Sequence, residues 1–128
     1  STFGGNPVTA QAGLKFLEIL QRESLVDRSA RLGAMLKNRL KELIGMHDII
    51  SDVRGLGLMV GVEIVGRKSL LATDCTDRIL ENMKNAGYLL GKTGPGRNVV
   101  TWMPPLTIKE QELMEAVETF EKVVQAGK

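Results

Sequence analysis

Residues 49–65 read IISDVRGLGLMVGVEIV, and this stretch decides the fold class. Its second half places apolar side chains at every second position, at Leu58, Val60, Val62 and Ile64. Alternation with a period of two is typical of a β-strand with one buried face. The first half is short and β-branched, and a segment with two glycines separates it from the second half. The stretch therefore predicts two strands joined as a hairpin, or one strand with a sharp bend.

Two helices are predicted before these strands. Asn6 and Pro7 indicate a helix start, because Asn accepts hydrogen bonds from the first amides and Pro lacks the amide that would go unpaired. Apolar residues then recur at helical spacing, which predicts a helix from Pro7 to about Glu23. Residues 24–27 resemble a capping box, with leucines at helical steps behind it. A second helix is therefore predicted, ending near Gly45.

The rest of the chain mixes helices and strands without strict alternation. The predicted elements are a helix at 74–86, strands at 88–91 and 98–103, a turn at 94–96, and a last helix that begins at a capping box at 107–110. This order points to an α+β fold, with helices packed on one face of a small, largely antiparallel sheet.

Composition excludes several classes of protein. The 128 residues are 43% hydrophobic and 25% charged, which excludes a disordered or collagen-like chain. A net charge of +2 is too balanced to indicate a nucleic-acid or polyanion partner. Cys75 is the one cysteine, so an internal disulfide is excluded and a reducing, cytoplasmic location is favoured. Cys75 and His47 are too few ligands for a structural zinc site, and no apolar run reaches the roughly 20 residues of a membrane span.

The strongest chemical candidate is the opening segment STFGGNP at residues 1–7. Ser1 and Thr2 supply hydroxyls, and the glycines let backbone amides approach an anion. The helix that follows is expected to add unpaired first-turn amides and the positive end of its dipole. These features predict a site for a phosphate or a carboxylate, although the same residues also suit a plain helix cap preceded by a turn.

Other residues give weaker candidates. Arg54 could hold a carboxylate, but a salt bridge to Asp52 or Glu63 is the favoured interpretation. The loop at 94–98 could face an anion, although a hairpin turn is the ordinary interpretation, and Trp102 is predicted to lie half-buried in a strand. The sequence contains no complete catalytic set such as a Ser-His-Asp arrangement, a metal cluster or a Walker loop.

Three motifs together resemble a known family. They are STFGGNP at 1–7, DVRGLGLM at 52–59, and NVV at 98–100 leading to PPLTI at 104–108. In this order and at similar distances they resemble class III (ω-amino acid) aminotransferases, fold-type I enzymes that include the 4-aminobutyrate, ornithine and acetylornithine aminotransferases. The resemblance covers essentially the whole chain and corresponds to the C-terminal third of such an enzyme. It implies a phosphate loop and linking helix at residues 1–23 and a small C-terminal domain at 24–128.

The resemblance also implies a cofactor contact. Thr2, with Ser1 and Phe3 beside it, is expected to hydrogen-bond the phosphate of pyridoxal 5'-phosphate across the interface of a homodimer. The lysine that carries the cofactor is expected upstream of the opening motif, so this segment would be inactive alone. The implied reaction of the whole enzyme moves an amino group from an amine or ω-amino acid to a keto acid or an aldehyde.

One position departs from the family's pattern. Many members that use α-ketoglutarate have an arginine for the substrate carboxylate where this sequence has Thr101. A hydroxyl cannot replace a bidentate guanidinium, so we consider Arg97, four residues earlier, as a substitute. The departure leaves room for an aminomutase or a phospho-amine lyase of the same family. A non-catalytic assembly module is a third alternative.

Overall fold

The computed structural model describes residues 2, 4–67 and 69–126. Along these residues the elements are α1 (Pro7–Arg22), α2 (Leu25–Glu42), β1 (Ile50–Leu56), β2 (Met59–Ile64), α3 (Ala72–Asn85), β3 (Gly91–Thr93), β4 (Val99–Trp102) and α4 (Glu110–Ala126). The strands form one sheet in the order β1-β2-β4-β3, and all neighbouring strands run antiparallel. The predicted α+β architecture is confirmed, and residues 50–64 form the predicted hairpin.

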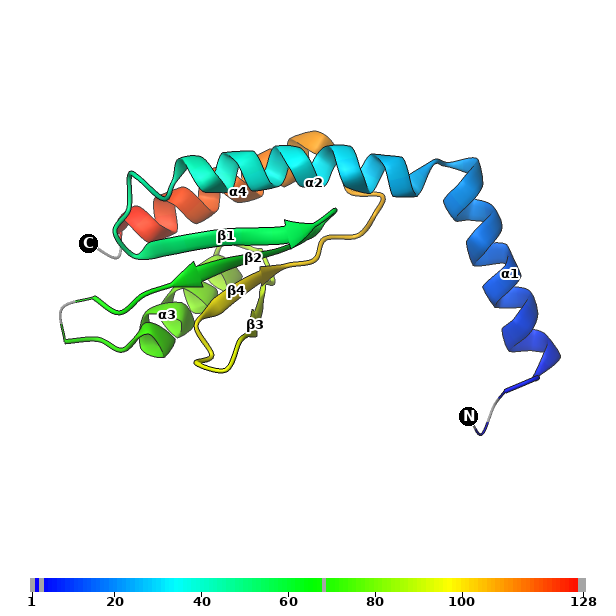
Figure 1. Ribbon diagram of the computed structural model, residues 1–128, viewed down its shortest axis with the longest axis horizontal. Helices are drawn as coiled ribbons and strands as arrows, with labels where there is room; N and C mark the ends of the chain where they lie inside the picture. The colour runs from blue at the N-terminus through cyan, green and yellow to red at the C-terminus, as the bar shows by residue number, and fades with distance from the viewer. Residues whose placement is uncertain (1, 3, 68, 127–128) are drawn as a thin grey trace.

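One face of the sheet is buried beneath three helices. On β2, Val60, Val62 and Ile64 are fully buried, while Gly61 and Glu63 between them are half-buried. The core cluster joins these valines to apolar side chains of α2, α3 and α4. Figure 1 shows α2 and α4 side by side along the sheet and α3 behind β2 and β4. The alternation seen in the sequence therefore separates a core face from a face that carries polar residues.

Trp102 lies deeper than the sequence predicts. Its side chain is 2% exposed, and its ring stands edge-on to that of Phe120 on α4, with centroids 5.5 Å apart at an interplanar angle of 76°. The prediction of a half-buried strand tryptophan is therefore wrong. The reason is that β4 lies inside the sheet, and α4 crosses the core face at this point.

Two predicted caps differ from the observed helix ends. Ser24 has φ +48°, its side chain makes no capping hydrogen bond, and its amide donates to Gln21 at the end of α1. The capping box at 24–27 is therefore wrong, because Ser24 serves the turn between α1 and α2. The second cap, predicted as a capping box at 107–110, is also wrong, because the last helix begins only at Glu110. At this helix start the Glu112 carboxylate accepts a hydrogen bond from the Lys109 amide at 3.1 Å.

The shortest strand is also displaced from its predicted position. β3 covers 91–93, whereas the sequence predicts 88–91. Its register is set by β4, where Gly91 pairs with Thr101 and Thr93 with Val99. A three-residue strand carries too little periodicity for its position to be predicted without its partner.

Helix α2 rests directly on the turn between β1 and β2. A Cβ added to Gly33 of α2 would lie 2.0 Å from the carbonyl oxygen of Gly57. Close by, the Ser29 hydroxyl accepts a hydrogen bond from the amide of Leu58 at 3.2 Å. Gly57 itself has φ +53°, a conformation that favours glycine. Backbone contact at Gly33 therefore fixes the height of α2 above the sheet.

Replacing Gly33 with alanine is expected to lower the free energy of unfolding by about 2 kcal/mol or more, because the new methyl group must displace backbone. Gly13→Ala in α1 is the matched control, since nothing lies within 4 Å of its Cβ position. The control is expected to stabilise the chain by about 0.5–1 kcal/mol through helix propensity. Urea unfolding followed by Trp102 fluorescence measures both, and equal midpoints for the two variants would contradict the packing.

Candidate cofactor and substrate site

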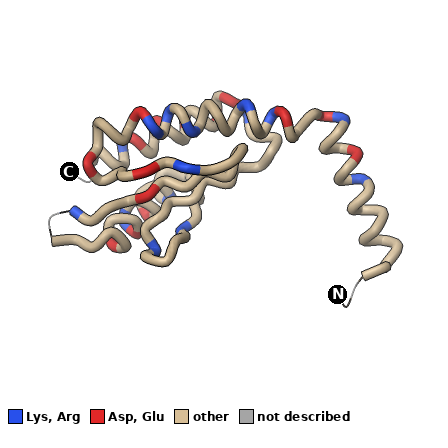
Figure 2. Tube along the Cα trace, viewed as in Figure 1, with Lys and Arg blue, Asp and Glu red and all other residues tan. Residues whose placement is uncertain are grey.

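The opening loop presents an uncharged surface. Thr2 is exposed, whereas Ser1 and Phe3 lie outside the described residues. Gly5 has φ +80°, and nothing lies within 4 Å of its Cβ position, so the loop turns in open space. The first charged residue of the chain is Lys15, and Figure 2 shows the N-terminal turns of α1 without acidic or basic positions. No carboxylate of this segment therefore opposes an anion near Thr2.

The first turn of α1 does not offer free amides. The Asn6 side-chain oxygen accepts hydrogen bonds from the amides of Val8 at 2.9 Å and Thr9 at 3.3 Å. The amide of Ala10 donates to the Asn6 carbonyl at 3.0 Å, and Pro7 has no amide hydrogen. The predicted helix start is confirmed, but the expectation of unpaired first-turn amides is wrong because Asn6 uses them. An anion here would depend on the Thr2 hydroxyl and on loop amides.

The polar face of the sheet holds a pair of hydroxyls. Thr101 on β4 stands between Gly61 of β2 and Gly91 of β3 in the same row. Its Oγ1 lies 2.9 Å from Oγ1 of Thr93, and the residue is only 8% exposed. Because directly opposed residues point to the same face, the two glycines leave Thr101 without larger neighbours in its row. Thr93 could not be identified from the sequence, since only the strand register brings it to Thr101.

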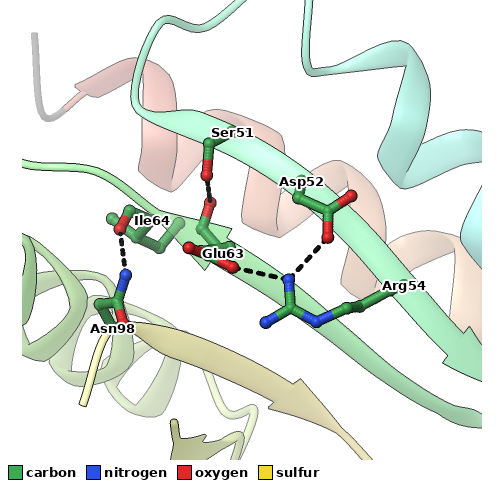
Figure 3. Close-up of polar contacts among 6 residues, drawn as sticks. All are labelled: Ser51, Asp52, Arg54, Glu63, Ile64 and Asn98. Atoms are coloured by element: carbon green, nitrogen blue, oxygen red, sulfur yellow. Dashed lines mark hydrogen bonds and ion pairs between the residues drawn. The ribbon is translucent and has the colours of Figure 1, made fainter. Parts of the chain in front are cut away.

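Arg54 forms a surface ion-pair network on the same face (Figure 3). One guanidinium nitrogen, Nη1, lies 2.6 Å from Oδ2 of Asp52 and 2.6 Å from Oε2 of Glu63. The hydrogen bonds with Asp52 and then with Glu63 raise the pKa of the Arg54 guanidinium above its ordinary value. The favoured interpretation of Arg54 as a salt-bridge residue is confirmed. Asp52 lies on the same strand as Arg54, and its pairing with Glu63 in the β1–β2 hairpin brings Glu63 within reach of Arg54 across the strands.

The structure separates Arg97 from Thr101. Arg97 is exposed, has φ +49°, and donates its amide to the Gly94 carbonyl at 3.0 Å, so it closes the turn between β3 and β4. At about 3.3 Å per residue of extended chain, its backbone lies at most roughly 13 Å from that of Thr101. The predicted turn at 94–96 is confirmed. A contact from Arg97 to a substrate requires the substrate carboxylate to lie over this turn, away from Thr101.

Asn98 anchors the start of β4, a structural role that its place in the predicted 94–98 loop and in the NVV motif did not indicate. Its side-chain amide donates to the Ile64 carbonyl at 2.9 Å, and its own carbonyl accepts from the Ile64 amide at 2.8 Å (Figure 3). Asn98 thus locks the end of β2 to the end of the β3–β4 hairpin. Ser51 makes a further link across the sheet, since its hydroxyl donates to the Glu63 carbonyl at 3.3 Å.

The remaining candidates do not assemble into a site. His47 and Cys75 are both buried, and among the described residues no group of His, Cys, Asp and Glu side chains has the arrangement of a metal site. His47 contributes its backbone amide to the Leu43 carbonyl after α2, while its Nδ1 has no partner in the described part. No helix in the part of the chain that the structure covers is long and apolar enough to cross a membrane.

Comparison with known proteins agrees with this geometry. The family Aminotransferase class-III matches residues 1–124. Alanine–glyoxylate aminotransferase 2 homolog 2, mitochondrial, of Arabidopsis thaliana is 42% identical over 94% of this chain and 26% of its own length. Ethanolamine-phosphate phospho-lyase homolog 1 of Caenorhabditis elegans is 32% identical over 97% of this chain and 27% of its own length.

Solved structures show the same fold. A Bacillus anthracis aminotransferase superposes with a TM-score of 0.87 and 36% identity, covering 98% of this chain and 30% of that structure. The fold is thus that of a part of this aminotransferase structure. The chain belongs to the class III aminotransferase family, and it spans less than a third of each of these relatives.

Arg54→Gln, made in the complete protein, is expected to lower the urea midpoint modestly and to leave the KM values of substrates unchanged. The physical reason is that Arg54 forms ion pairs with two neighbouring carboxylates, and exposed pairs of this kind are weak and screened by salt. The stability difference from wild type should shrink in concentrated NaCl. A selective rise in the KM of one carboxylate substrate would instead show that Arg54 binds that substrate.

Proposed function

We propose that this chain is the C-terminal part of a pyridoxal 5'-phosphate-dependent aminotransferase. The complete enzyme moves an amino group from an amine or ω-amino acid to a keto acid or an aldehyde. The family match over residues 1–124 carries this proposal, because it includes the opening loop as well as the whole folded domain. Residues 1–23 then form the junction with the large domain, and residues 24–128 form the small domain.

The opening loop suits the phosphate of the cofactor. Thr2 is exposed on an uncharged segment, where its hydroxyl can donate to a phosphate oxygen. The cofactor supplies the electron sink of the reaction, and a lysine upstream of this chain carries it. The role of this segment is then to hold the phosphate end through Thr2, with Ser1 and Phe3 beside it, and so to orient the cofactor.

Helix α1 supports an assembly in which further protein covers it. The helix contains no buried residue, and its exposed apolar side chains include Val8, Leu14, Phe16 and Leu17, which are 55–76% exposed. Figure 1 shows α1 bent away from the rest of the fold, which it meets only at α2. Large apolar side chains left exposed along a helix in this way indicate an interaction site. In a homodimer, such a covered α1 would carry Thr2 to the cofactor phosphate of the partner subunit.

A heterodimer tests this arrangement. One subunit lacks the cofactor-bearing lysine, and the other carries Thr2→Ala. If Thr2 acts across the interface, one of the two sites has both residues intact, and the heterodimer keeps about half of the wild-type activity. If Thr2 acts within its own subunit, both sites are defective. The Thr2→Ala homodimer is expected to bind the cofactor at least about tenfold more weakly, and Thr2→Ser is the matched control that keeps the hydroxyl.

The environment of Thr101 supports the hypothesis that no substrate α-carboxylate binds at this position. The hydroxyl is paired with Thr93 and largely buried, so it forms a wall of the substrate pocket instead of an ion-pair partner. A substrate carboxylate that approached from the β3–β4 turn would meet Arg97 instead. Both residues are proposed to border the substrate, Thr101 as a wall and Arg97 as a carboxylate contact.

The pair of residues gives a prediction for acceptor specificity in the complete enzyme. Arg97→Ala is expected to raise the KM of a carboxylate-bearing acceptor about tenfold while kcat changes little, because a charge-assisted hydrogen bond is lost. Lys41→Ala is the control, since Lys41 is exposed on α2. Steady-state kinetics with α-ketoglutarate measures both variants. An unchanged KM for Arg97→Ala would remove Arg97 from the substrate site.

A phospho-amine lyase is the second candidate, and an aminomutase belongs to the same alternative. Thr101 favours it, and one relative is named as a homolog of an ethanolamine-phosphate phospho-lyase. Incubation of the complete protein with phosphoethanolamine distinguishes the reactions. A lyase releases ammonia and phosphate in the absence of any keto acid, whereas a transaminase needs the acceptor and forms a new amine from it.

We also propose a cytoplasmic location. Its support is the single cysteine, Cys75, which is buried and free, as is usual for proteins of a reducing compartment. Fractionation of cells that express the complete protein tests it, and enrichment in mitochondria would contradict it.

A further inference from the structure

A pocket lies away from the opening loop and from the polar face of the sheet. It has a volume of about 570 Å³ and is formed by α3, the C-terminal turns of α4 and the connection from β2 to α3. This end of the fold is opposite the N-terminal loop (Figure 1). The volume falls within the range of roughly 300–1,000 Å³ that small-molecule sites occupy.

The floor of this pocket is apolar. Ile79 of α3, Val124 of α4 and Ile49 before β1 contribute buried side chains to it. On α3, Cys75, Ile79 and Asn82 recur at steps of four and three, so that one face of the helix forms a wall. The floor therefore offers contact to an apolar chain, and Asn82 offers a polar edge.

Two arginines stand at the rim. Arg67 lies on the connection and Arg78 on α3, and both line the pocket. Among the described residues, neither guanidinium has a carboxylate within 4.0 Å. The one acidic side chain that lines the pocket, Glu81, is held by Lys84 through contacts of 2.8 and 2.9 Å.

The neighbouring carboxylate on α3 is also engaged. Asp77 lies one residue before Arg78, and its Oδ1 is 2.5 Å from Nζ of Lys92 on β3. The side chain of Lys92 is only 10% exposed, and its ammonium also donates to the Thr73 hydroxyl. Asp77 and Glu81, the acids that flank Arg78 on α3, are thus each paired with a lysine and not with an arginine of the pocket.

The fold fixes the position of Arg67. Its amide donates to the Leu70 carbonyl at 3.1 Å, and the Leu70 amide donates back at 2.9 Å. A Cβ on Gly66 would lie 2.7 Å from the Leu70 carbonyl oxygen, so a glycine is needed where the two backbone segments approach each other. The backbone from which the Arg67 side chain extends is thus fixed beside the pocket.

We propose that this pocket binds an organic anion with a short apolar chain, its carboxylate or phosphate held by Arg67 and Arg78 and its chain lying on the floor. Guanidinium groups suit both head groups because they bind them in a bidentate manner. The site is separate from the cofactor loop and from Thr101, so its ligand is neither the cofactor nor the amino-group substrate. The proposal does not depend on the proposed reaction.

Calorimetry on the complete protein with hexanoate and hexyl phosphate as probes tests this site. Saturable binding with a Kd below about 1 mM is expected for at least one probe, and the preferred head group identifies the source of the anion. Hexanol and acetate, which each lack one half of the proposed ligand, are expected to bind at least about tenfold more weakly.

The double variant Arg67→Gln with Arg78→Gln is expected to raise that Kd at least about tenfold. Lys41→Gln with Lys122→Gln is the control, because it removes the same charge from exposed lysines that do not line the pocket. The far-ultraviolet circular dichroism spectrum shows whether each variant is folded. Absence of saturable binding, equal binding of hexanol, or an unchanged Kd in the arginine variant would each overturn the proposal.

Discussion

The burial of one face of the antiparallel sheet determines the rest of this structure. Val60, Val62 and Ile64 enter the core at every second position of β2, and three helices cover them. Gly33 lets α2 approach the β1–β2 turn at backbone distance. Because the strands are antiparallel and in fixed register, the residues between the buried ones must all point to the opposite face.

That constraint also places the residue proposed to border the substrate on β4. Val100 and Trp102 occupy the core, so Thr101 between them belongs to the polar face, between two glycines of the neighbouring strands. The same register places Arg54 beside Asp52 and Glu63, so that one guanidinium is shared by two carboxylates. The polar face therefore presents hydroxyls and an ion-pair network with one more acid than base, and Arg97 lies apart from it on the exposed turn.

The sequence predicts the features that depend on local pattern. The hairpin at 50–64, the helix that begins at Pro7 and the turn at 94–96 follow from alternation, capping and glycine, and each is confirmed. Features that depend on a distant partner were missed. Trp102 is buried because its ring packs against Phe120 of α4, and β3 takes its position from its pairing with β4.

The candidate site was predictable to the same extent. The opening loop was identified by its residues, but the Asn6 cap, which the sequence also predicts, uses the α1 amides that the anion site was expected to offer. Arg54 was correctly interpreted because its partners lie two and nine residues away. Thr93 and the pocket beside Arg67 and Arg78 require three-dimensional proximity between segments that no local pattern connects.

The central claim is that the hydroxyl of Thr2, in the opening loop, completes a cofactor site by binding the cofactor phosphate. A crystal structure of the complete protein with pyridoxal 5'-phosphate tests this claim most directly. We predict that the Thr2 hydroxyl lies within about 3 Å of a phosphate oxygen of a cofactor held by the other subunit. A phosphate group held entirely within one subunit, with the opening loop turned away from it, would contradict the account.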